Sequence, residues 1–316
     1  MKKICVLLLA TAAVIGLCAG SASADEKQVK IGLIQPVEHT SLNTIRENFI
    51  QQLRKIGYSE DRVAIDYRNA QGDRTKIKAV CQQFVSDKVD MIVAVATPAA
   101  QGAAAATSDI PIVFLAVSDP VKAGLLKNLE APEGNITGTS DVVPVDQIFK
   151  LAGEITPNAK KFGFLYNAGE ANSLTAIEKA KAYCDSNGLT YTEATVGSAS
   201  EVQSAARSLA DKVDAFFCPN DNTIASSMSV VSQVAAEAKI PVYVGAITMV
   251  IDGGLATAGV DSGEMGILGA NLAGEMLSGK KISELPVVIV QKYNLMVNKK
   301  AADKLGLDVT AYKSVN

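Results

Sequence analysis

The sequence predicts an α/β protein of two doubly wound lobes, each built on a parallel sheet with helices on both faces. Short apolar runs rich in β-forming residues alternate with helical stretches, and this alternation is typical of βαβ units. The alternation then starts again near Phe162 with similar spacing, so the second half repeats the architecture of the first. A chain of 316 residues also suits two domains of about 150 residues each.

The first lobe is predicted from four apolar runs that read as strands. They are KIGLIQP from Lys30, VAIDY from Val63, MIVAVAT from Met91 and IVFLAV from Ile112. Helical stretches at 41–57 and 75–88 separate the first three runs. In the first stretch Ile45, Phe49 and Leu53 fall on one helical face, as expected for a helix that packs on a sheet.

The second lobe repeats this rhythm. Its strand-like runs are FGFLYN from Phe162, TYTEATV from Thr190, AFFCPN from Ala215 and VYVGAI from Val242. The tail adds a strand at 256–260, a helix from about Glu264 and one strand, VVIVQKYNLMVN, from Val287. The glycines at 259, 263, 266 and 269 indicate close helix packing. Two lobes joined by several chain crossings would explain these late elements, because each lobe would incorporate one of them.

Residues 1–24 have the features of a secretory signal peptide. Lys2 and Lys3 precede an apolar run from Ile4 to Leu17, and Ala22-Ser23-Ala24 provides small residues before the expected cleavage site. The run is too short to span a membrane, which takes about 20 apolar residues. We therefore expect an exported, periplasmic protein. Lipid attachment at Cys18 is the alternative, and Leu17 argues against it because a small residue normally precedes the modified cysteine.

Charge and cysteine usage exclude several classes of protein. The net charge is −3, and cleavage would remove two of 30 basic and none of 33 acidic residues, giving −5. A mildly acidic chain without basic clusters is not expected to bind nucleic acid. Cys81, Cys184 and Cys218 remain after cleavage, with no metal-site spacing; they are expected to be buried thiols, although one disulfide is possible in an oxidising compartment.

Enzyme signatures are also missing from the sequence. A single histidine cannot build a His-rich metal site. No phosphate-binding G-x-x-x-x-G-K-[ST], dinucleotide-binding G-x-G-x-x-G or nucleophile-elbow G-x-S-x-G is suitably placed. We expect no catalysis, no cofactor and no metal.

Polar loops follow the predicted strands, and the loops of parallel strands gather at one edge of each sheet. Thr97-Pro98 suits an N-cap and first helical position, and free N–H groups at a helix start favour an anion. Asn172-Ser173 repeats this arrangement in the second half. Asp221 lies among amides after a strand, where it could cap a helix or receive an ammonium group.

Several segments together resemble one family. VEH (37–39), NAQGD (69–73), ATPAAQ (96–101), SDP (118–120), YNAGEANS (166–173) and NDNT (220–223) are similar to segments of exported ABC-transporter substrate-binding proteins of the tryptophan/tyrosine-binding type. The resemblance covers the chain from residue 25 onward. It implies a type I periplasmic-binding-protein fold, in which two lobes joined by three crossings close on a ligand, and a permease and an ATPase as partners.

The resemblance also implies boundaries and contacts. The N-terminal lobe would comprise 25–141 and 262–288, and the C-terminal lobe 142–261 and 289–316. The implied ligand contacts are Glu38, His39, Thr97, Pro98, Asp119, Ser140, Asp141, Glu170, Asn172, Ser173, Asp221, Asn222 and Asp261. Two places depart from the family pattern: 246–248 is less polar than expected, and Ser262 stands where relatives often carry an aromatic residue.

We therefore expect a monomeric receptor that captures a small zwitterion, most simply an aromatic or other apolar amino acid. The helix starts at Thr97 and Ser173 would serve the carboxylate, and Asp221, Glu170 or Asp261 the ammonium, because both charges need partners in a closed cleft. Three alternatives stay open at this point. They are a receptor of the same fold for a sugar or nucleoside, a module that reports a ligand to a membrane kinase, and an exported enzyme.

Overall fold

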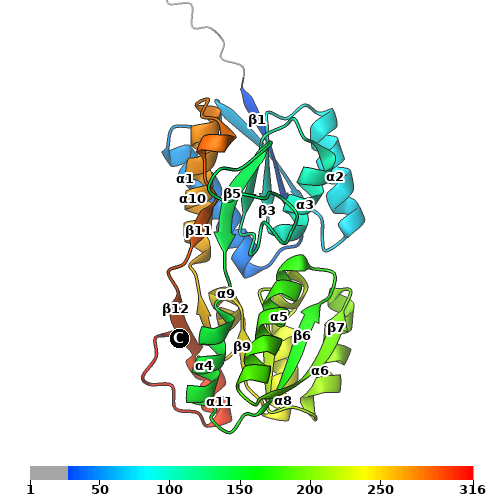
Figure 1. The fold of residues 1–316 in the computed structure, drawn as a ribbon, viewed down its shortest axis with the longest axis vertical. Helices are drawn as coiled ribbons and strands as arrows, with labels where there is room; N and C mark the ends of the chain where they lie inside the picture. The colour runs from blue at the N-terminus through cyan, green and yellow to red at the C-terminus, as the bar shows by residue number, and fades with distance from the viewer. Residues whose placement is uncertain (1–27, 316) are drawn as a thin grey trace, which may run out of the picture.

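The computed structural model describes residues 28–315 as two α/β lobes stacked along the long axis of the molecule (Figure 1). The predicted signal peptide and Cys18 lie outside the described residues. Within that range, no helix is long and apolar enough to cross a membrane. Cys81, Cys184 and Cys218 are all free and buried, as expected, and burial raises the pKa of the Cys81 thiol to about 12, which keeps it unreactive.

The N-terminal lobe is a six-stranded parallel sheet in the order β11-β5-β4-β3-β1-β2. Helices α1 and α10 cover one face of the sheet, and α2 and α3 cover the other, each face having its own apolar core. The elements are β1 (Val29–Gln35), α1 (Thr40–Lys55), β2 (Val63–Asn69), α2 (Arg74–Ser86), β3 (Met91–Val95), α3 (Thr97–Ala106), β4 (Ile112–Leu115), β5 (Ile136–Asp141), α10 (Ser262–Leu277) and β11 (Val288–Val290).

The C-terminal lobe is a seven-stranded sheet in the order β13-β12-β10-β9-β8-β6-β7, in which only the β10–β12 pair among the described strands is antiparallel. Cores on both faces make this lobe doubly wound as well. Its elements are α4 (Val145–Ile155), β6 (Lys161–Asn167), α5 (Ala171–Ser186), β7 (Thr190–Val196), α6 (Val202–Ala210), β8 (Ala215–Cys218), α7 (Asn222–Ala225), α8 (Met228–Ala238), β9 (Val242–Val244), α9 (Ile247–Ile251), β10 (Ala256–Gly259), β12 (Asn294–Asn298), α11 (Lys299–Leu305) and β13 (Ser314–Val315).

The chain crosses between the lobes three times, after β5, between β10 and α10, and between β11 and β12. The last crossing corrects two expectations. The run from Val287 is two strands in different sheets, not one strand, because Lys292 and Tyr293 pass between the lobes. The crossing also lies after Val290, so the expected boundary at 288 cuts through β11, which pairs in parallel with β5.

Strand β5 was absent from the predicted strands because its sequence, ITGTSD, carries few apolar residues. Strand β5 is nevertheless buried, and its buried hydroxyls are satisfied by hydrogen bonds to the surrounding backbone. Thr137 Oγ1, for example, donates to Leu285 O over 2.8 Å.

The glycines of α10 allow close packing against α1, as the sequence predicts. A Cβ added at Gly266 would collide with the backbone oxygen of Ile45 and lie 2.9 Å from Phe49 N. Gly263 similarly faces Asn48. Gly259 differs from this expectation, because it ends strand β10 and lies against Ile247. The close approach of α10 fixes the start of α1 at the cleft between the lobes.

Candidate functional site

A cavity lies between the two lobes, where the carboxyl ends of both sheets face each other. It encloses about 40 Å³, so the lobes lie close together. The lining residues come from the loops and helix starts after β1, β3, β4, β5, β6, β8 and β9. They are His39, Ser41, Leu42, Ile45, Ala96, Thr97, Ala116, Ser118, Asp141, Asn172, Asn220, Asp221, Asn222, Ala225, Ala246, Thr248 and Met249.

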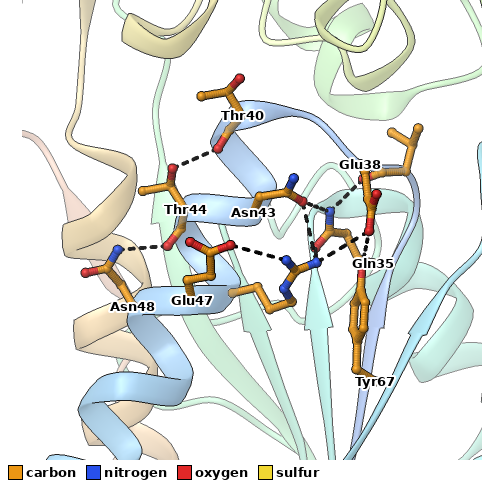
Figure 2. A network of polar contacts seen from close by, with 10 residues as sticks. Gln35, Glu38, Thr40, Asn43, Thr44, Glu47, Asn48 and Tyr67 are labelled. Carbon is orange, nitrogen blue, oxygen red and sulfur yellow. Dashed lines mark hydrogen bonds and ion pairs between the residues drawn. The ribbon is translucent and has the colours of Figure 1, made fainter.

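A polar network at the rim holds the start of α1 in place (Figure 2). Gln35 Nε2 donates to Val37 O and to Asn43 Oδ1, both over 2.8 Å. Tyr67 donates its hydroxyl hydrogen to Glu38 Oε1 over 3.2 Å, so the Glu38 carboxylate belongs to the rim. These bonds fix the turn that presents His39 to the cavity.

Two alanines of the N-terminal wall have unusual backbone angles. Ala96 has φ 69° and Ala116 has φ 56°, in the left-handed region that non-glycine residues rarely adopt. Both follow a sheet strand and both line the cavity. Such strain persists only where surrounding structure imposes it, and it is concentrated at functional sites.

The C-terminal wall is built around two buried carboxylates. Glu170 accepts hydrogen bonds from the side-chain amides of Asn172 and Asn222, from the backbone N–H of Asn222, and from both the N–H and hydroxyl of Thr223. Asp221 accepts from Asn167 N and Ser173 Oγ, each over 2.6 Å, and from Ile224 N. These bonds tie the starts of α5 and α7 together.

Hydrogen bonds also join the lobes across the cleft. Asn220 Nδ2 of the C-terminal lobe donates to Ser118 Oγ over 2.7 Å and lies 3.3 Å from Asp141 Oδ2. His39 Nε2 lies 3.3 Å from Asn222 Oδ1. The protein's own side chains therefore hold the lobes together on both sides of the cavity.

Burial changes the protonation of the ionisable groups in the cavity. Burial raises the pKa of the Asp141 carboxyl to about 6, although hydrogen bonds from Ser118 and Asn220 oppose the rise. Burial and then the Glu170 charge raise the pKa of Asp221 to about 7. Burial lowers the pKa of His39 to about 4, so this imidazole is neutral at pH 7.

Four buried polar atoms of the cavity lining have no hydrogen-bond partner in the described part of the chain. They are Thr97 Oγ1, Asn172 Oδ1, Asn220 Oδ1 and Thr248 Oγ1, and the only other such side-chain atom in that part is Arg54 Nε, away from the cavity. Buried polar atoms are nearly always satisfied, because leaving one unpaired costs about 1–3 kcal/mol. The clustering of these atoms at one cavity indicates a place for a bound polar molecule.

The structure brings six of the predicted contacts to the cavity and places the others elsewhere. Those lining it are His39, Thr97, Asp141, Asn172, Asp221 and Asn222. Glu170 and Ser173 lie directly behind the C-terminal wall. Pro98 lines a second groove between the lobes, which shares Asn222 with the cavity, and Ser140 is buried in the sheet. Asp119 belongs to a turn, Glu38 belongs to the rim network, and Asp261 caps α10.

Two helix caps differ from expectation. Ala96 and Glu170 hold the N-cap positions of α3 and α5, so neither Thr97 nor Asn172-Ser173 caps a helix. The Thr97 hydroxyl is thereby left free to face the cavity. Asp221 and Asp261 do cap their helices, through Ile224 N and Gly263 N.

The sequence reasoning missed Asn220, Thr248, Ser118 and Met249 as site residues. The first three follow predicted strands, which was the available signal, but an uncharged amide or hydroxyl there is common in ordinary turns. Ser262 bonds Ser41 over 2.9 Å, and no phenylalanine or tyrosine among residues 28–315 lines the cavity.

Comparison with known proteins gives one consistent result. A model of the family described as ABC transporter substrate binding protein matches residues 30–315. A tyrosine-binding protein of Clostridioides difficile is 41% identical over 293 residues, covering 91% of this chain and 85% of the relative.

Two solved structures allow the arrangement of the lobes in this chain to be compared with that in relatives. An ABC domain of Streptococcus pneumonia in complex with L-Trp is 37% identical with a TM-score of 0.88, covering 91% of this chain and 100% of that one. A ligand-free, open substrate-binding protein from Clostridium difficile is 38% identical with a TM-score of only 0.68, covering 91% and 99%. Because the identities are nearly equal, the lobes of this chain are arranged more like those of the L-Trp complex.

Proposed function

The chain belongs to the family of ABC transporter substrate-binding proteins, and from this premise we propose that it captures an aromatic amino acid between its lobes. Two relatives support this ligand class, since one is named a tyrosine-binding protein and another was solved with L-Trp. We further propose, from the family and the predicted signal peptide, that the protein is exported, acts as a monomer and delivers its ligand to a membrane permease with an ATPase.

The observation that carries the proposal is the cluster of buried polar atoms without partners at the cavity. Thr97 and Thr248 offer hydroxyl groups, and Asn172 and Asn220 offer carbonyl oxygens. An amino acid supplies the complementary set, a carboxylate that accepts and an ammonium that donates. Both charges of a zwitterion must find partners when the cleft closes, and this lining can satisfy both.

We assign the ammonium to Asp141 on the basis of its spare hydrogen-bonding capacity. Each Asp141 oxygen accepts one long bond, of 3.1 Å from Ser118 and 3.3 Å from Asn220. Glu170 instead accepts five hydrogen bonds from wall residues, Asp221 accepts three, and Asp261 caps α10. Asp141 therefore replaces the three carboxylates favoured by the sequence.

We assign the carboxylate to Thr97, Thr248 and the start of α3. The ten residues of α3 leave N–H groups free in its first turn, and a helix N-terminus favours negative charge. The ligand side chain would lie against Leu42, Ile45 and Met249.

Calorimetry and thermal shift with each of the 20 amino acids, a sugar panel and nucleosides test the proposal. We expect binding of at least one of tyrosine, tryptophan and phenylalanine, and a ligand at 100 times its Kd adds about 2.7 kcal/mol of stability. Asp141→Asn should weaken binding about 100-fold, because a charge-assisted bond becomes neutral.

The matched control is Asp146→Asn, the same chemical change at an exposed side chain of α4, which should leave the Kd unchanged. Binding of a sugar or nucleoside with no response to any amino acid would overturn the proposal in favour of another ligand class on the same fold.

A further inference from the structure

The ionisable groups that line the cavity are acidic or neutral. Asp141 and Asp221 are carboxyl groups, and burial keeps the His39 imidazole uncharged at pH 7. Glu170 lies behind the wall and adds a further carboxylate. No lysine or arginine of the described chain is among the lining residues. A carboxylate bound here would therefore meet no side-chain cation.

Three basic side chains that belong to the rim or join the two lobes are not among the residues lining the cavity. Arg46 lies on the rim, where it bonds Gln35 and pairs with Glu47 over 3.4 Å. Lys122 pairs with Glu178 over 2.7 Å on the outer surface. Arg74 lines a second groove between the lobes, which shares Asn222 with the cavity, and a Cβ at Gly169 would lie 3.2 Å from its Cζ. None of these three cations lines the cavity that holds the unpaired hydroxyls of Thr97 and Thr248.

The two ends of an amino acid would consequently be recognised with different strength. Its carboxylate would meet hydroxyl hydrogens and backbone N–H groups, and these donors also bond the carbonyl oxygen of an amide. Its ammonium would meet the Asp141 carboxylate, so this contact would pair two full charges, whereas the ligand carboxylate would meet only uncharged donors. Removing the ammonium would also leave that carboxylate without its partner, which adds a desolvation penalty.

We infer that this site selects its ligand by the amino group, so that its ligand class is aromatic primary amines, including amino-acid amides and decarboxylated amines as well as the free amino acid. The inference rests on the proposed function for the location of the site and on the aromatic side chain. It goes further in ranking the two charged groups of the ligand and in admitting ligands that carry a net positive charge.

Four ligands with the same ring test this ranking on the wild-type protein by calorimetry. They are L-tyrosine, L-tyrosinamide, tyramine and 3-(4-hydroxyphenyl)propionic acid, with the matching L-tryptophan, L-tryptophanamide, tryptamine and indole-3-propionic acid as a second series. We expect the amide to bind within about tenfold of the amino acid, because the same uncharged donors bond the amide oxygen and only the charge assistance of those bonds is lost. The deaminated acid should bind at least 100-fold more weakly than the amide.

A deaminated acid that binds as tightly as the amide in both series would overturn the inference while leaving the proposed function intact. Failure of both amino acids and both amines to bind would overturn both. Binding of the amines without the amino acids would keep the inference and overturn the proposed ligand.

The variant Asp141→Asn gives an independent reading. It should weaken amine binding and leave the Kd of the deaminated acid unchanged or lower, whereas equal weakening of both ligands would indicate a merely structural role for Asp141. Its near-ultraviolet circular dichroism checks the fold. The wild-type series decides the question even if the variant is unstable.

Discussion

The two walls of the cleft are built in different ways. The C-terminal wall is a buried polar network, in which Glu170 and Asp221 accept hydrogen bonds from the starts of α5 and α7. The N-terminal wall depends on close packing, in which Gly266 of α10 admits the backbone of Ile45. One wall is therefore sensitive to the loss of charge, and the other to the gain of volume.

In the proposed site, this difference would also divide the recognition of the ligand between the walls. The carboxylates of the C-terminal wall are occupied by hydrogen bonds within the wall, so this wall presents mainly amide oxygens to a ligand. The N-terminal wall supplies the apolar surface of Leu42 and Ile45, and the carboxylate with spare capacity, Asp141. A buried acidic residue is thus not by itself a ligand contact, since its partners decide whether it can bind anything further.

Replacing Glu170 by Ala should have the largest effect on stability. The change leaves donors of Asn222 and Thr223 without an acceptor, and each such buried group costs about 1–3 kcal/mol. We expect the free energy of unfolding to fall by about 3–5 kcal/mol, measured by urea denaturation. Glu38→Ala, at an exposed rim carboxylate, should change it by less than about 0.5 kcal/mol. Equal effects of the two would show that the polar network does not hold the wall.

Replacing Gly266 by Ala tests the other wall and should have a smaller effect. The added methyl would force α10 away from Ile45 and Phe49, and overpacking typically costs about 1–3 kcal/mol. Because Ile45 lines the cavity, ligand affinity should fall along with stability, as calorimetry would detect. In the control Gly153→Ala, within α4, nothing lies within 4 Å of the new Cβ, and about 0.5–1 kcal/mol of stabilisation is expected. An unchanged affinity in Gly266→Ala would separate the packing of α10 from the shape of the cavity.

The smallest effect on ligand affinity is expected for a surface ion pair that joins the two lobes. Lys122 and Glu178 join the lobes over 2.7 Å, but both side chains are more than half exposed. Such pairs contribute about 0.2–1 kcal/mol, so Lys122→Ala should weaken ligand binding by less than about fivefold. The loss should shrink further in high salt, which screens surface charges. A large loss of affinity that does not depend on salt would show that this pair contributes to lobe closure more than its exposure predicts. Lys127→Ala, in the same loop, is the control.

The fold was predictable because its signal is periodic. The alternation of apolar runs and helices identified both doubly wound lobes, and the glycines at 263, 266 and 269 identified the close packing of α10. Strand β5 was missed because Thr137, Thr139 and Ser140 reach their partners only in the folded sheet. The split between β11 and β12 was missed because nothing local distinguishes a strand from two strands on either side of a crossing.

The site was predictable in location but less so in detail. Parallel sheets collect polar loops at one edge, which brought Thr97, Asn172 and Asp221 to one cavity as the pattern suggests. Which polar groups keep a free oxygen depends on neighbours distant in sequence. The Asp221 carboxylate accepts hydrogen bonds from Asn167 and Ser173, which are about 50 residues away in the sequence, whereas the side-chain oxygen of Asn220 remains unpaired.

The triple crossing has a consequence for how the polypeptide becomes a folded molecule. A ribosome releases the N-terminal segment first, yet that lobe lacks α10 and β11 until nearly the whole chain has emerged. Until then the side of α1 that faces α10 is open to water, and the edge of β5 has no neighbour. The N-terminal sheet therefore cannot be completed before the last part of the chain is present, and a truncation before β11 would remove strands from both sheets at once.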